Sequence, residues 1–325
     1  MNNIFFIKKH SLLIVSFLFL TFMSCGQKKH LDSTTGDTLS GKVRISGSFA
    51  LYPMMVKWAE TFKILHPDVS FDISGGGAGK GMTDVLNEMV DVGMVSREIY
   101  SQEVENGAFC ILVAKDAVVP IVNVANPELK AILSIGLRKE IARKLWNEKI
   151  KTWGAVLGTS SKTCVHVFTR SDACGAAETW ASWFNARQED LKATSIFGDP
   201  GIADAIQKDK FGIGYNNISY AYNRKTKKLN EGLAIIPLDV NGNGKIDPEE
   251  SFYETMESLI TAINDGRYPS PPARYLYLVT KGKPTSPALI SFLKYILSEG
   301  QKYEVETGYI GLSQNELDKE IEKIK

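Results

Sequence analysis

The chain has 325 residues, of which 44% are hydrophobic and 23% are charged. This composition excludes a disordered or fibrous protein, because such chains are poor in apolar residues or strongly biased in composition. The 38 Lys and Arg residues nearly balance the 37 Asp and Glu residues, which gives no electrostatic argument for nucleic-acid binding. The length predicts two domains of ordinary size. No CxxC, HExxH or GxSxG motif occurs, and we expect a protein that is not an enzyme.

Residues 1–24 are predicted to be a signal peptide. They contain no acidic residue, and Lys8 and Lys9 precede an apolar run over residues 11–22 that is too short to cross a bilayer as a helix. The following FMSC resembles a bacterial lipobox, in which Cys25 would be lipidated. Residues 25–41 then form a flexible tether, and the protein is exported and membrane-anchored, in the periplasm or at the cell surface. The alternative is a cytosolic chain with an apolar N-terminus.

Strands and helices alternate from residue 43 onward. Strands are predicted at 43–46, 69–74 and 90–96. The apolar spacing predicts one helix over 53–65 and a second that carries Met82, Val85, Leu86 and Met89. Strands joined by helices in this way indicate a parallel sheet with right-handed crossovers.

The apolar run 108–127 is too long for one ordinary strand and is predicted to leave one domain and enter the next. Domain 1 is expected to contain residues 42–117 and 236–325, and domain 2 residues 118–235. The further elements predicted are a helical region at 128–150, strands at 165–169, 211–217, 233–240 and 275–280, a helix at 176–184, helices after 250, and a last helix at 314–325.

Small or polar residues follow four of these strands, where ligands bind in open α/β sheets. Glycine lets the backbone approach a ligand, and a helix N-terminus offers unpaired N–H groups to an anion. Any single glycine-rich turn can be plain loop geometry, but four such loops together favour an anion site. The candidate ligand-binding residues are Ser48, Phe49, Gly77, Ala78, Ser96, Arg97, Arg170, Asp172, Cys174, Gly175 and Ala176.

Two of these loops allow a sharper interpretation. Asp172 lies two residues after Arg170 and can fix its guanidinium, leaving the other face of the group for an oxyanion. The alternative is a surface ion pair that contributes little. The GGGAGKG segment at 75–81 lacks the P-loop spacing, so nucleotide hydrolysis has no support.

Five segments resemble, in order, the signatures of the periplasmic phosphate-binding proteins of ABC transporters. They are SGSFALYP (46–53), SGGGAGKGMTDVL (74–86), VDVGMVSRE (90–98), TRSDACGAAETW (169–180) and YPSPPARYLYLVTKGKP (268–284). The resemblance implies an α/β, two-domain type II periplasmic binding protein, with mixed, mostly parallel sheets joined by a two-strand hinge. It also implies a monomer that captures phosphate or a related oxyanion between its domains and delivers it to an ABC permease.

The chain departs from that family in four loops. Phe49 stands where a hydroxyl residue is usual in the first loop. Ala78 stands where serine is usual, and Cys174 and Ala176 replace hydroxyl residues. Arg97 stands where the family often has an aspartate that accepts the proton of bound phosphate. The extra arginine predicts a preference for a more fully ionised anion.

The segment DVNGNGKIDPEE (239–250) matches the calcium-loop template D-x-[DN]-x-[DN]-G-x5-E at every constrained position. The oxygen ligands would come from Asp239, Asn241, Asn243, the carbonyl of Lys245, Asp247 and Glu250. We expect a single structural Ca²⁺ site here, and no catalytic cofactor. The alternative is an Asn- and Gly-rich turn that binds no ion.

Two other function classes remain open from the sequence. An anchored hydrolase of phosphate esters could use the same anion site, but it would need a nucleophile with a base or a catalytic metal. The only histidine near the four loops, His166, is predicted inside a strand. The third class is an anion sensor without a transport role.

Overall fold

The computed structural model describes residues 39–325 of the chain. The predicted signal peptide, Cys25 and most of the predicted tether lie outside these residues. Within 39–325, no helix combines the length and the apolar character needed to cross a membrane.

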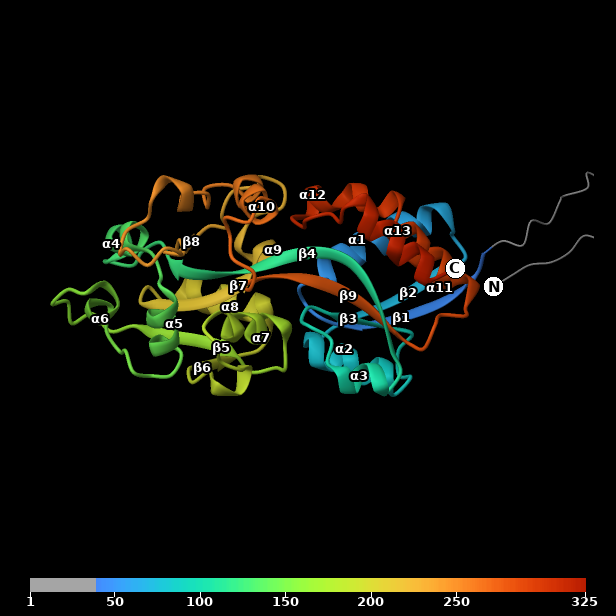
Figure 1. The fold of residues 1–325 in the computed structure, drawn as a ribbon, viewed down its shortest axis with the longest axis horizontal. Helices are drawn as coiled ribbons and strands as arrows, with labels where there is room; N and C mark the ends of the chain where they lie inside the picture. Colours follow the sequence, from blue (N-terminus) through green and yellow to red (C-terminus); the bar gives the residue numbers. More distant parts are fainter. Residues whose placement is uncertain (1–38) are drawn as a thin grey trace, which may run out of the picture. The chain divides into compact units, whose positions relative to one another are not determined.

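The described strands form one nine-stranded mixed sheet (Figure 1). The strand order is β2-β1-β3-β9-β4-β7-β5-β6, and β8 pairs with β4 beside this path. The strands are β1 (Gly41–Gly47), β2 (Val69–Gly75), β3 (Val92–Val95), β4 (Ala108–Asn123), β5 (His166–Arg170), β6 (Thr194–Ile196), β7 (Gly212–Asn217), β8 (Leu233–Ile235) and β9 (Ala273–Lys281). Strands β1, β2 and β3 are parallel as predicted, whereas β9 runs antiparallel to β3 and to β4.

The helices are α1 (Tyr52–Leu65), α2 (Gly77–Leu86), α3 (Ser101–Glu105), α4 (Leu129–Ile135), α5 (Lys139–Leu145), α6 (Trp153–Leu157), α7 (Gly175–Trp183), α8 (Gly198–Lys208), α9 (Ile218–Ala221), α10 (Met256–Asn264), α11 (Pro287–Ile296), α12 (Glu304–Thr307) and α13 (Gln314–Lys323). Short 3₁₀ turns lie at η1 (Gln188–Asp190), η2 (Pro248–Glu250) and η3 (Glu299–Tyr303). Helix α1 has Pro53 in its first turn and buries Trp58 and Phe62 on one face, as its apolar spacing predicts. Helix α2 ends at Leu86, so Met89 lies beyond the helix and is 63% exposed.

The long apolar run forms one continuous strand of 16 residues, β4. Its first part, from Ala108 to Ala117, pairs with β9. From Val118 onward β4 pairs instead with β7, and near its end also with β8. Figure 1 shows β4 and β9 side by side, connecting the elements around α1 and α2 with those around α7 and α8. The two halves of this run therefore pair with different strands, and its passage between two domains stays a prediction.

Buried side chains form two large hydrophobic clusters, which we call the first and the second core. The first core gathers β1, β2, α1, the early part of β4, the middle of β9 and α11, and it includes Trp58 and Phe292. The second core gathers the later part of β4 with β5, β7, α5, α7 and α8, and it includes Trp146 and Trp180. The aromatic side chains of both cores are almost completely buried.

The return of the chain to the first core occurs later than the sequence predicts. The predicted boundary was residue 236, but the buried residues from Phe252 to Ala273 belong to the second core. The chain rejoins the first core only at Leu276, within β9. The physical reason is that Phe252 and Tyr253 pack against Tyr268, whose hydroxyl donates to the Val118 carbonyl in β4.

Candidate functional site

The candidate site lies where strands of both cores end. Strands β1 and β3 pair in parallel and are followed directly by Ser48 and Ser96, which therefore lie at the same edge of the sheet. In the second core, β5 pairs in parallel with β6 and β7 and ends at Arg170. A backbone hydrogen bond of 3.0 Å from the N–H of Gly79 to the carbonyl of Ala173 joins the two edges. The four loops that the sequence singles out thus meet in space.

Two serine hydroxyls contact each other in the first core's half of the site. The Oγ atoms of Ser48 and Ser96 lie 2.6 Å apart, and both residues are almost completely buried. The Ser48 Oγ also accepts the N–H of Ala50 at 3.1 Å. Because only one of the two hydroxyls can donate to the other, the second retains a proton that it can donate to a ligand.

The approach of the two halves requires glycine at two positions. A Cβ atom on Gly175 would lie 2.0 Å from the carbonyl oxygen of Ser96. Gly77 has a φ of +86°, and a Cβ there would lie 2.7 Å from both the Ala173 carbonyl and the Asp172 carboxylate. Real Cβ contacts of this length do not occur, so any side chain at these positions would force the loops apart.

Both glycines also begin helices. Gly77 and Ala78 form the start of α2, and Gly175 and Ala176 form the start of α7. The N–H groups of a first helical turn have no acceptor within their own helix, and they carry the positive end of the helix dipole. Ala78 and Ala176 have no polar side-chain atoms, so they can contribute to a ligand only through the backbone. Two helix N-termini at one place favour an anion.

Arg170 is the buried cation of the site, and two carboxylates hold it. Its Nε and Nη2 atoms donate to Asp172 at 2.8 and 2.5 Å, and its Nη1 donates to Asp199 at 2.6 Å. The three side chains are 1%, 8% and 2% exposed. Burial alone would lower the pKa of Arg170, but the neighbouring carboxylates raise it well above its usual value. Arg170 is therefore a permanent, fixed charge.

Asp199 belongs to a buried polar network that the sequence analysis did not identify. Its Oδ1 accepts the Nδ2 of Asn217 at 2.5 Å, and the Oδ1 of Asn217 accepts from Arg274. Arg274 in turn donates to Asp116 at 2.7 Å. Asp116 on β4 and Arg274 on β9 are cross-strand partners in the two long strands. The one sequence feature that points to Asp199 is its place in the first turn of α8, where an acidic side chain is favoured.

The Arg97 side chain makes its hydrogen bonds with its own loop and with α3. Its Nη atoms make a two-point ion pair with Glu103 at 2.6 and 3.0 Å and donate to the Glu98 carbonyl at 2.8 Å. The guanidinium also lies over the Tyr100 ring, 4.2 Å from its centre. The assignment of Arg97 to the ligand stays a prediction, and in this structure Glu103 and the Glu98 carbonyl accept from its Nη atoms. The predicted preference for a fully ionised anion rests on that assignment.

Phe49 closes the site on another side. Its ring packs edge-on against Phe197 with centres 5.8 Å apart, and the Arg170 guanidinium lies 5.7 Å from its centre. Its carbonyl accepts the hydroxyl of Tyr220 at 3.1 Å. The Phe49 ring thus forms an apolar wall beside the Arg170 guanidinium. Phe49 follows β1 of the first core, whereas Arg170 ends β5 of the second core.

Cys174 caps α7 rather than adding a charged group. Its Sγ accepts the N–H of Ala177 at 3.4 Å, and its own N–H donates to the Gln188 Oε1 at 3.1 Å. Burial raises the pKa of the thiol to about 12, although the Arg170 charge acts in the opposite direction. The thiol is therefore neutral at physiological pH, and the Cys174 amide is already occupied.

The loop 239–250 folds around its own carboxylates. Asp239 accepts the N–H groups of Gly242 and Gly244 at 2.7 and 2.8 Å, and the buried Glu250 accepts that of Val240 at 2.8 Å. The exposed Lys245 ammonium lies 2.7 Å from the carboxylate of the half-buried Asp247.

The Asp247 carboxylate also accepts the side-chain amides of Asn241 and Asn243, at 3.0 and 2.6 Å. The hydrogen bond from Lys245, together with these amides, lowers the pKa of Asp247 to about 2. Over residues 39–325, no group of three or more His, Cys, Asp and Glu side chains is arranged to hold a metal ion.

Comparison with known proteins agrees with this architecture. A family model described as "PBP superfamily domain" matches residues 32–300. The phosphate-binding protein PstS of Bacillus subtilis is 26% identical over 93% of this chain and 94% of its own length. A crystal structure from Clostridium perfringens, assigned as a phosphate ABC transporter substrate-binding protein with bound phosphate, superposes with a TM-score of 0.69. It is 22% identical and covers 84% of this chain and all of that one.

A second solved structure has the same fold. It is an ABC-type phosphate transport receptor from Vibrio cholerae, with a TM-score of 0.59, 20% identity and coverage of 83% of this chain and all of its own. The match of the family model over most of the chain confirms the resemblance that the ordered motifs indicate. The chain belongs to the PBP superfamily.

Proposed function

We propose that the protein captures inorganic phosphate at the four loops and delivers it to an ABC permease. The observation that carries this proposal is the buried Arg170, fixed by Asp172 and Asp199 where two helix N-termini and a serine pair meet. Fixed donors of this kind replace the water around a bound anion without reorganising. The names of its relatives, which describe phosphate binding and ABC transport, support the same function.

The charges around Arg170 favour an anion that carries a proton. Two carboxylates, Asp172 and Asp199, surround one guanidinium, so this group of side chains has a net charge of −1. A carboxylate can accept a hydrogen bond from a protonated phosphate oxygen, whereas sulfate has no proton to donate at neutral pH. This supports phosphate over sulfate.

A hydrolase is less well supported by the geometry. The described histidine closest in sequence to the site is His166, whose Nδ1 lies 2.7 Å from the Asp209 carboxylate. His166 begins β5 and Arg170 ends it, which separates them by roughly 13 Å of extended chain. The His–Asp pair therefore lies at the wrong end of the strand to act on an anion held by Arg170.

Two further parts of the proposal come from the sequence. We propose that residues 1–24 are removed and that a lipid on Cys25 anchors the exported, monomeric protein to a membrane. We also propose that β4 and β9 act as the hinge between two domains that close on the anion. The pairing of Asp116 with Arg274 across these strands supports a hinge that is coupled to the site.

For the loop 239–250 we propose a structural Ca²⁺ site. The template supplies three carboxylates, two amide oxygens and one carbonyl, which is the oxygen-rich set that calcium prefers. Asp239 and Glu250 are already buried and held by loop N–H groups. Binding would require Asp247 to exchange the Lys245 ammonium for the cation. Bound calcium would then tie the segment after β8 to the turn at η2.

Calorimetric titration of the purified protein with phosphate, sulfate and arsenate tests the main proposal. We expect saturable phosphate binding with a stoichiometry of one, and weaker binding of sulfate. Absence of phosphate binding in protein that is shown to be folded would contradict the proposed function.

A further inference from the structure

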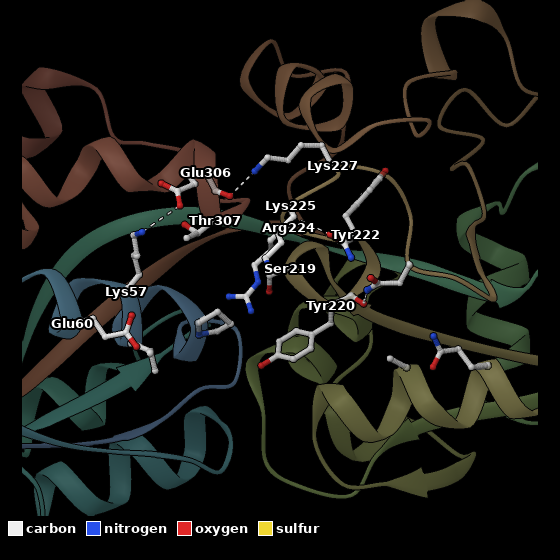
Figure 2. A pocket seen from close by; sticks show the side chains of 16 residues that line it. Lys57, Glu60, Ser219, Tyr220, Tyr222, Arg224, Lys225, Lys227, Glu306 and Thr307 are labelled. Carbon is white, nitrogen blue, oxygen red and sulfur yellow. Dashed lines mark hydrogen bonds and ion pairs between the residues drawn. The ribbon is translucent and has the colours of Figure 1, made fainter.

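A large hollow lies beside the anion site, with a volume of about 1080 Å³. Helices α1 and α12 line one side of it, and α8, α9 and the loop after α9 line the other (Figure 2). Because these elements belong to different parts of the sheet, the hollow opens between them. None of the loops that surround Arg170 lines it.

The lining of this hollow has an excess of positive charge. It contains four basic side chains, Lys57, Arg224, Lys225 and Lys227, and two acidic ones, Glu60 and Glu306. Lys57 pairs with Glu306 at 3.2 Å, and Lys227 donates to the Glu306 carbonyl. Among the described residues, Arg224 and Lys225 have no ion-pair partner. Figure 2 shows the Arg224 guanidinium directed into the space between α1 and Tyr220.

A buried hydroxyl on the same lining also lacks a partner. Ser219 is 9% exposed, and its Oγ makes no hydrogen bond within the described part of the chain. The neighbouring Tyr309 hydroxyl donates its own proton to the Ala50 carbonyl. Ser219 therefore places a hydroxyl group, which can donate and accept hydrogen bonds, on the wall of the hollow.

Tyr220 separates this hollow from the anion site. Its ring lines the hollow, and its hydroxyl donates to the Phe49 carbonyl at 3.1 Å. The ring of Phe49 faces Arg170 on the other side. Burial and the Asp199 charge raise the pKa of Tyr220, and the Arg224 and Arg170 charges act in the opposite direction.

We propose that the hollow is an entry vestibule for phosphate, in which Arg224 and Lys225 attract the incoming anion. The Tyr220–Phe49 hydrogen bond is the contact that opens to admit the anion to Arg170 and closes behind it. The inference rests on the proposed capture of phosphate. Uncompensated charges at the mouth of a site raise the association rate by long-range attraction. Since Arg224 lies outside the closed site, it does not hold the bound anion.

Stopped-flow fluorescence of phosphate binding, measured over a range of salt concentrations, tests the vestibule. The charge-reversed double variant Arg224→Glu/Lys225→Glu should lower the association rate constant on the order of tenfold at low salt. The difference should shrink above about 0.15 M salt, where the Debye length is about 8 Å. The dissociation rate constant should stay nearly unchanged.

The matched control is Arg143→Glu/Lys144→Glu, which makes the same charge change on exposed neighbours in α5. This control should leave the association rate unchanged. A third variant, Tyr220→Phe, should speed dissociation several-fold, because it removes the hydroxyl that closes onto Phe49. Circular dichroism establishes that each variant is folded.

The outcomes separate the two proposals. If the folded parent does not bind phosphate, the proposed function fails. If the parent binds but the Arg224/Lys225 variant associates as fast as the parent, or loses only what the α5 control loses, the vestibule is wrong. A change confined to dissociation would place Arg224 in the bound complex and would equally overturn the inference.

Discussion

The Nη1 atom of Arg170 lies 2.6 Å from the Oδ2 atom of Asp199, and both side chains are at most 2% exposed. Asp172 already makes a two-point contact with the same guanidinium, so Asp199 is a second carboxylate on one cation. Burial raises the pKa of Asp199, and the charges of Arg170 and Arg274 counteract this. The anion site is therefore built around one arginine that pairs with two carboxylates, so that negative charge exceeds positive charge in this group.

Replacing Arg170 with Ala should weaken phosphate binding by about 2–5 kcal/mol, the usual effect of truncating a buried, hydrogen-bonded charge. Arg97→Ala is the matched comparison, because the donors of Arg97 are taken by Glu103 and Glu98. We expect its phosphate affinity to stay within about threefold of the parent, less than 1 kcal/mol. Calorimetric titration measures both. Equal losses in the two variants would contradict the assignment of the site.

Replacing Asp199 with Asn should reduce the preference for phosphate over sulfate. The change removes one negative charge beside Arg170, and a fully ionised anion gains more from this than a protonated one. At an effective dielectric constant of about 20, the Coulomb difference should change the ratio of the two affinities by at least about tenfold. Competition titrations with sulfate measure that ratio. An unchanged ratio would show that Asp199 does not influence the choice of anion.

The Gly175→Ala variant should lose most phosphate affinity, because its Cβ would lie 2.0 Å from the Ser96 carbonyl and would hold the two halves of the site apart. Gly201→Ala in α8 is the control, since its nearest contact is a side-chain methyl, Ile196 Cγ2 at 2.9 Å, and not the backbone. Isothermal titration and thermal melting should show lost binding for the first variant and retained binding for the second. Full affinity in Gly175→Ala would mean that the loops need not approach this closely.

Glu304 should make the stability of the protein depend on pH. The residue is 1% exposed, its Oε1 lacks a hydrogen-bond partner among the described residues, and burial raises its pKa to about 8. Between the ordinary glutamate pKa of about 4.3 and pH 8, the folded state holds a proton that the unfolded state has released. The free energy of unfolding should therefore fall as the pH rises through this range, by up to about 1.4 kcal/mol per pH unit.

Denaturant titrations at several pH values measure this dependence. Glu304→Gln copies the protonated carboxyl group and should flatten the pH profile and stabilise the protein near pH 8. Glu299→Gln, at an exposed position in η3, should leave the profile as it is. A Glu304→Gln variant with the pH dependence of the parent would show that another group is responsible.

Calcium should stabilise the protein through the loop 239–250. Because the ion would bind only the folded loop, the free energy of unfolding should rise by about 2.7 kcal/mol at a hundredfold excess over Kd. Glu250→Gln keeps an oxygen for the N–H of Val240 but loses the bidentate charge, and should abolish the increment. Its neighbour Glu249 lies outside the template, so the Glu249→Gln variant should still be stabilised by calcium. A melting temperature that changes with neither calcium nor chelator would show that the loop is a turn that binds no calcium.

The sequence by itself determined the order of the elements and the local chemistry of the loops. Glycine and serine directly after β1, β2 and β3 mark strand ends, and the two-residue spacing of Arg170 and Asp172 already implies their contact. The apolar run 108–127 predicts a segment that leaves one domain and enters the next, and its first 16 residues form β4. These features depend on residues close together in the chain, whose geometry is set by backbone periodicity and short spacing.

Only the tertiary structure decided which charges meet. Asp199 is 29 residues from Arg170, and Arg274 is 158 residues from Asp116, so no local pattern reports these pairs. Arg97 shows the converse, because its glutamate partner six residues away removes a charge that the loop pattern assigned to the anion. The late return of the chain at β9 likewise depends on Tyr268 packing with Phe252 and Tyr253. Many carboxylates in the chain could pair with a given arginine, and nothing local in the sequence distinguishes them. Long-range packing decides which pairs form, because it brings the groups together only when the cores form.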